Sequence, residues 1–188
     1  QALGFTKQDI ANEFYENEIY KYDEKLNKWK TKFNPENYKT KNFSGEVIDA
    51  RTNKIIVKAG EKINFLTAKK LLNDGLKEIY VSNQTLYGKY LHKDTKVGEE
   101  TFKIGTEITD SILEKIISDN TKELEISNTN SINKGPYLLQ TLLNDKNETK
   151  NESITEVYKV LRPGEPPTIE IASQIFNNLF FSSERYDL

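Results

Sequence analysis

The stretches VKAGEKI at residues 57–63 and FKIGTEI at residues 102–108 share one pattern, and this pattern decides the predicted fold. They lie 45 residues apart, and the same offset places Leu71-Leu72 on Ile116-Ile117 without a gap. Self-similarity at a fixed spacing indicates a repeated folding unit. Because only two copies exist, the chain is expected to hold a duplicated module rather than a solenoid.

Each copy is interpreted as a strand, a glycine turn, a helix and a second strand. Gly60 and Gly105 supply the turns, since glycine adopts a positive φ without steric cost. The first helix opens at Asn64 or Thr67 and the second at Thr109, because Asn and Thr cap helix N-termini. Neither copy can bury its apolar face alone, so the two are expected to pack as one α+β body.

The remaining boundaries of the two copies follow from turn residues and from alternating apolar residues. The copies span about residues 45–82 and 88–127, and their helices are expected to end at 73–75 and 118–120. Strands are expected at 47–48, 77–82, 87–91 and 123–127.

The N-terminal part predicts a helix followed by a β-hairpin. Thr6 and Asp9 form a shortened capping box, which opens a helix over residues 7–16 with Ile10, Ala11 and Phe14 on its apolar face. Alternating residues 18–23 and 28–33 then predict the two strands of the hairpin, and the polar residues 34–41 predict a loop.

The C-terminal part is less regular in sequence. Residues 138–143 form a short apolar run, and residues 154–161 are compatible with a helix or a strand. Residues 162–167 contain three prolines and cannot be helical. A final helix is expected after Thr168, with a stripe formed by Ile169, Ala172, Ile175, Phe176 and Leu179.

Composition excludes several classes of function. The 188 residues include 27 Lys and Arg against 29 Asp and Glu, so the net charge is −2, which argues against tight non-specific nucleic-acid binding by the chain alone. With no Cys and one His, neither a disulfide framework nor a thiolate or multi-histidine metal site is expected. No apolar stretch approaches the roughly 18 residues of a membrane span.

Met is absent even at position 1, so the chain is expected to be a piece of a longer protein.

The search for catalytic residues finds none. The chain contains no glycine-rich phosphate loop and no nucleophile elbow. His92 is interpreted as an ordinary strand or loop residue, of the kind that is usually exposed. Trp29, set among Lys28, Lys30 and Lys32, either stacks on a nucleic-acid base or packs inside the hairpin, and packing is favoured. We therefore expect no catalytic, cofactor-binding or metal-binding residue.

Longer motifs in the C-terminal third resemble the bacterial DNA-directed RNA polymerase β subunit. They are GPY at 135–137, EVY at 156–158, LRPGEPPT at 161–168, FNNLFFS at 176–182 and ERYDL at 184–188. ALGFT at 2–6 also resembles this family, and residues 17–127 resemble it more weakly. Val160-Leu161 stands where the family has a Met pair.

The resemblance implies a place within a larger enzyme. Residues 1–16 and 133–188 would belong to the lobe, a mainly helical segment of the subunit, and residues 17–132 to a lineage-specific insertion that contains the hairpin and both repeats. The lobe would line the DNA cleft of this nucleotidyltransferase. The catalytic magnesium would lie on the partner β′ subunit, so this segment alone is expected to be inactive.

The resemblance also implies partners and candidate contact residues. The partners would be the rest of the β subunit, the β′, α and σ subunits, downstream and promoter DNA in weak contact, and secondary-channel regulators, in the cytoplasm and away from membranes. Arg162 would either face DNA or pair with Glu165, Glu170 or Glu184. Arg185 and Tyr186 would anchor a neighbouring domain. Two alternatives stay open, namely a free-standing protein-binding module and a hydrolase that uses scattered carboxylates.

Overall fold

The computed structural model describes residues 1–38, 46–58, 60–61, 63–129 and 134–182. The chain divides into two compact units, which are described separately: one comprises Ala11–Leu143, and the other comprises Gln1–Ile10 with Asn144–Leu188. Helices and antiparallel strands occur together, so the predicted α+β class is confirmed. Within the described residues, no helix is both long enough and apolar enough to cross a membrane.

A seven-stranded sheet organises the larger unit, in the order β4-β3-β5-β2-β1-β9-β6. Its pairings are all antiparallel, and β7 and β8 form a separate two-stranded sheet. The strands are β1 Asn17–Asp23, β2 Lys28–Lys32, β3 Val47–Asp49, β4 Ile55–Val57, β5 Glu78–Val81, β6 Tyr90–Leu91, β7 Thr95–Val97, β8 Glu100–Phe102 and β9 Glu123–Ser127.

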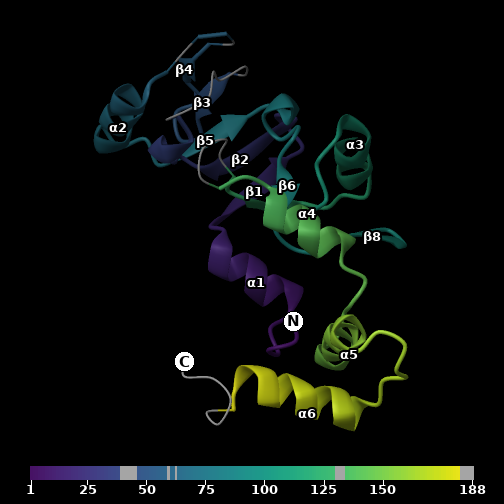
Figure 1. Cartoon of the computed structure of the whole chain (residues 1–188). Helices are drawn as coiled ribbons and strands as arrows, with labels where there is room; N and C mark the ends of the chain where they lie inside the picture. The colour runs from purple at the N-terminus through teal and green to yellow at the C-terminus, as the bar shows by residue number, and fades with distance from the viewer. Residues whose placement is uncertain (39–45, 59, 62, 130–133, 183–188) are drawn as a thin grey trace. The chain divides into compact units, whose positions relative to one another are not determined.

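Helices accompany this sheet. The larger unit holds α2 Phe65–Asn73, α3 Asp110–Ser118, nearly all of α4 Tyr137–Asn144, and the 3-10 turns η1 Pro35–Tyr38 and η2 Asn83–Thr85. Figure 1 shows α2 near the β3–β4 end of the sheet and α3 near β6. Helix α1 (Lys7–Phe14) crosses from one unit to the other at Ile10 and Ala11.

Several elements of the two expected repeats occur at matching positions. Helices α2 and α3 begin and end 45 residues apart, and so do strands β4 and β8. Gly60 and Gly105 have φ values of 82° and 83°, as glycine turns require. Asn64 caps α2 by accepting from the Thr67 N–H, and Thr109 caps α3, so of the two candidates Asn64 is the cap. Duplication of an ancestral unit stays a prediction.

The strands differ between the two repeats. β4 joins the main sheet through β3, whereas β8 pairs with β7, a strand that the sequence analysis did not predict. The strand expected at 87–91 is reduced to Tyr90–Leu91. The turn around Gly88, whose φ is 74°, accounts for the shortening, because this backbone conformation is incompatible with an extended strand.

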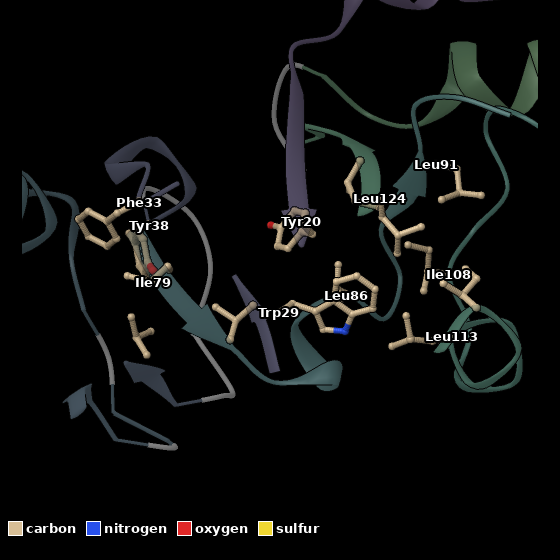
Figure 2. Close-up of a cluster of buried hydrophobic side chains, with 14 of the residues drawn as sticks. Tyr20, Trp29, Phe33, Tyr38, Ile79, Leu86, Leu91, Ile108, Leu113 and Leu124 are labelled. Atoms are coloured by element: carbon tan, nitrogen blue, oxygen red, sulfur yellow. The ribbon is translucent and has the colours of Figure 1, made fainter. Parts of the chain in front are cut away.

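The core of the larger unit is continuous from one end of the sheet to the other. Figure 2 shows Trp29 beside Leu86 in the middle of this cluster, with Phe33 and Tyr38 on one side and Ile108 and Leu113 on the other. Strand alternation accounts for the burial, since Tyr20 of β1 and Trp29 of β2 point to the same side. Burying a large apolar side chain contributes about 1.5–3 kcal/mol.

Helix α1 buries a different face from the predicted one. The reciprocal bonds between Thr6 and Asp9 confirm the capping box, and the helix ends at Phe14 rather than at residue 16. Phe14 is 58% exposed, whereas Ala11 and Tyr15 are buried. The inward stripe therefore passes through Ala11 and Tyr15, four residues apart, and the Tyr15 hydroxyl donates to the Gly135 carbonyl at 2.8 Å.

The smaller unit is built around two packed helices, α5 (Lys150–Leu161) and α6 (Ile169–Phe180). Residues 154–161 are therefore helical, and a capping box between Thr149 and Glu152 starts the helix earlier than their apolar stripe indicates. The buried core consists of Ile154, Tyr158, Ala172 and Phe176. Thr168 caps α6 as predicted, but Ile169 is half exposed because it occupies the first helical position, beside the cap.

Candidate nucleic-acid contact at the α5–α6 loop

The loop between α5 and α6 holds Arg162 in a defined position. Arg162 follows the last residue of α5, and its N–H donates to the Tyr158 carbonyl at 2.8 Å. The Glu165 N–H in turn donates to the Arg162 carbonyl at 3.3 Å, which closes a turn. Gly164 occupies this turn with a φ of 87°, a conformation that favours glycine. Pro163 within the turn, and Pro166 and Pro167 after it, restrict the backbone further.

Arg162 forms an ion pair inside this loop. Its Nη1 atom lies 3.4 Å from Glu165 Oε1, and both side chains are 55% exposed. Exposed ion pairs of this kind contribute about 0–1 kcal/mol, because water screens the charges. The guanidinium can therefore leave this carboxylate for another anion at little cost.

Glu165 has a second partner, which the sequence analysis did not anticipate. The hydroxyl of Tyr158 donates to Glu165 Oε2 at 3.0 Å. Tyr158 is 3% exposed and belongs to the core between α5 and α6. Burial and the bond to Glu165 raise the pKa of this hydroxyl, so at neutral pH it stays protonated and donates. One oxygen of the carboxylate is thus anchored, while the other faces Arg162.

Of the two interpretations of Arg162, an acidic partner or contact with DNA, the structure contains the first. Arg162 pairs with Glu165. Contact with DNA stays a prediction, and it is chemically suitable because a guanidinium presents planar N–H donors that match a phosphate. Arg185 and Tyr186, the expected anchors of a neighbouring domain, lie outside the described residues.

His92 is a buried structural residue rather than an exposed one. Its ring nitrogens lie 2.9 Å from Ser127 Oγ and 2.8 Å from Asn12 Oδ1. With 1% exposure, it joins α1 to β9 through this pair of hydrogen bonds. Sequence reasoning missed its burial because a single polar residue near a strand carries no periodic signal.

His92 predicts a pH dependence of stability. Burial lowers its pKa below the ordinary 6.5, although nearby Glu125 acts in the opposite direction. Below pH 6.5, His92 therefore takes up a proton more readily in the unfolded chain than in the folded chain. The stability that the neutral, buried His92 contributes is thus complete above pH 6.5 and declines as the pH falls toward the pKa of the folded state. Between pH 7 and pH 5, the free energy of unfolding measured in urea should fall more for the native chain than for His92→Gln. An equal fall in both proteins would contradict the assignment of this pH dependence to His92.

Trp29 packs inside the sheet, so the base-stacking interpretation is wrong. The indole is fully buried, and its Nε1–H donates to Asn83 Oδ1 at 3.0 Å. Its lysine neighbours Lys28 and Lys30 form ion pairs with Glu46 and Glu78 at 3.2 and 2.8 Å. Trp29 is therefore inaccessible to a nucleic-acid base.

A second polar cluster, also missed from the sequence, joins β1 to the segment before β6. Lys89 Nζ donates to the Tyr20 hydroxyl at 2.7 Å, and that hydroxyl donates to Glu18 Oε2 at 2.9 Å. Asn37 donates to the other carboxylate oxygen of Glu18 at 2.6 Å. Burial and the charge of Glu18 raise the pKa of Tyr20 well above its usual value. These satisfied hydrogen bonds give the cluster a structural role.

Metal-binding residues do not gather in the part of the chain that is described, where no group of three His, Cys, Asp or Glu side chains is placed to hold an ion.

The curated relatives that resemble this chain carry the same name. No protein-family profile matches the chain. The chain is 37% identical over 190 residues to the DNA-directed RNA polymerase subunit beta of Rhizobium leguminosarum bv. trifolii, and 38% identical over 195 residues to that of Rickettsia rickettsii. Each match covers the whole chain but 14% of the relative. Over its full length, the chain is therefore similar to a segment of the DNA-directed RNA polymerase β subunit.

Proposed function

We propose that this chain is a non-catalytic segment of the β subunit of a bacterial RNA polymerase and that it acts in DNA-templated transcription. The observation that carries the proposal is the 37–38% identity over the whole chain to proteins named as that subunit. Nucleotidyl transfer would occur elsewhere in the enzyme, with the catalytic magnesium on the β′ subunit. The segment would supply shape and contact area, in the cytoplasm and alongside the β′, α and σ subunits.

We further propose that residues 17–132 are an insertion in a lobe formed by residues 1–16 and 133–188. The contacts at the boundary support this division. Strand β1 pairs with β9 so that Asn17 lies opposite Ser127, and the Asn128 N–H donates to the Glu16 carbonyl at 2.7 Å. The chain thus enters and leaves the sheet at adjacent points, as an insertion requires if it is not to disturb its host.

The lobe segments would line the DNA cleft, with Arg162 as a phosphate contact. The exposed position of Arg162 and its weak ion pair support this role, because a guanidinium that exchanges partners easily can follow a moving DNA backbone. A single such contact adds little affinity, so DNA binding by this segment alone would be weak.

The inserted sheet unit would serve as a docking surface for regulators of transcription, including those that enter the secondary channel. Its rigid core supports this role, since a continuous apolar cluster holds the sheet while the charged residues remain outside. The alternative, a free-standing protein-binding module, predicts that the natural product begins near residue 1. An intact-mass measurement of the native protein distinguishes the two.

Removal of the insertion tests the proposed function directly. In the intact polymerase, replacing residues 17–132 by a short Gly-Ser linker should remove the proposed insertion, near whose boundary the Asn128 N–H donates to the Glu16 carbonyl. Basal nucleotide addition should stay near the native rate, because no catalytic group is removed, whereas the response to added regulators should change. Single-round transcription assays measure both. Loss of all nucleotide addition by a correctly assembled enzyme would contradict the proposal.

A further inference from the structure

The Glu165 carboxylate lies between two groups with different freedom to move. Tyr158, on the inner face of α5, is buried in the core of the smaller unit and donates to Oε2 at 3.0 Å. Arg162 is half exposed and approaches Oε1 at 3.4 Å. The turn closed by the Glu165 N–H fixes the backbone between them. The carboxylate thus has a second partner besides Arg162.

This arrangement determines what a phosphate must overcome to bind Arg162. An incoming phosphate competes with a carboxylate for the same guanidinium, and it meets that anchored negative charge a few ångströms away. A carboxylate that accepts from Tyr158 is less free to move away from the phosphate than a surface glutamate without such a bond. Arg162 and Glu165 together carry no net charge, so a polyanion gains little by approaching this loop.

We propose that Glu165, anchored by Tyr158, is a positioning residue that limits how tightly Arg162 binds nucleic-acid phosphate. The proposal rests on the proposed function, in which Arg162 faces DNA. It assigns to the anchored carboxylate the task of keeping this contact weak and exchangeable. The ligand is the phosphodiester backbone, read without regard to base sequence.

The test uses the intact polymerase holoenzyme and a fluorescent promoter DNA fragment, titrated at several salt concentrations. E165Q keeps an oxygen that can accept from Tyr158 but removes the charge, so affinity should rise roughly two- to fivefold, the range of a weak exposed ion pair. R162A should weaken binding and reduce the slope of log K against log salt by about one. Y158F should tighten binding less than E165Q, because it releases the carboxylate without removing it.

Two controls separate this effect from general electrostatics. E156Q removes a similarly exposed carboxylate, which pairs with Lys159 at 2.6 Å on the same helix, and it should not tighten binding comparably. In the R162A background, E165Q should have no effect. Thermal unfolding of each purified enzyme shows whether a variant is folded.

The outcomes are distinguishable. If R162A leaves affinity and salt slope unchanged, Arg162 does not contact DNA, and that part of the proposed function fails together with the inference. If R162A weakens binding but E165Q has no effect, or if E165Q tightens binding equally without Arg162, the contact stands and the role of Glu165 is rejected. Tightening by E165Q that requires Arg162 supports the inference.

Discussion

Replacing Gly105 by alanine should destabilise the larger unit by about 3–4 kcal/mol, which combines overpacking with the strain of an alanine at positive φ. A Cβ atom at this position would overlap the backbone oxygen of Leu139 on α4 and lie 2.9 Å from its carbonyl carbon. It would also meet the Leu143 Cβ atom at 3.3 Å. Because the nearest atoms belong to a helix backbone, side-chain rotation cannot relieve the overlap, and α4 must shift.

Gly60 provides the matched control for this substitution. Its φ of 82° is nearly the same as that of Gly105, but among the described residues no atom lies within 4 Å of a Cβ built on it. Gly60→Ala should therefore cost about 1 kcal/mol, from backbone strain alone. Urea unfolding of the two variants, followed by circular dichroism, measures the difference. Equal losses would show that α4 does not pack against the Gly105 turn.

The sequence predicted those features of the fold that depend on local chemistry. Glycine turns, the cap at Thr109 and the alternation of the hairpin depend on residues that are adjacent in sequence, and all occur in the structure. The close approach of α4 to Gly105 could not be predicted, because Leu139 lies far along the chain and is near in space only once the sheet has formed. The pairing of β8 with the neighbouring strand β7, in a separate two-stranded sheet, was also not predicted.

The candidate site was predictable to the same limited degree. Arg162 was identified as a cation in a rigid loop, and Glu165, three positions further along, was among its possible partners. Residue spacing does not show where the Tyr158 hydroxyl points, even where it places the ring in a core. The anchoring of Glu165 therefore became visible only in the structure.

Trp29→Ala should destabilise the larger unit by about 3–5 kcal/mol, the cost typical of emptying a buried aromatic site. Trp29 lies in β2, between β1 and β5 near the middle of the sheet, where its ring is fully buried. It packs against Tyr22 with 4.9 Å between ring centroids. Since it is the one tryptophan of the chain, unfolding of the variant must be followed by circular dichroism rather than by intrinsic fluorescence.

Two further variants separate packing from hydrogen bonding at this position. Asn83→Ala leaves the ring in place but removes the acceptor of the indole N–H, which should cost about 1–3 kcal/mol as a buried unsatisfied donor. Tyr137→Ala removes an aromatic ring that is 77% exposed and should change the unfolding midpoint little. The expected order of destabilisation is therefore Trp29→Ala, then Asn83→Ala, then Tyr137→Ala. If Trp29→Ala unfolded at the same urea concentration as Tyr137→Ala, the indole would have to lie at an accessible surface, and base stacking would again be a valid interpretation.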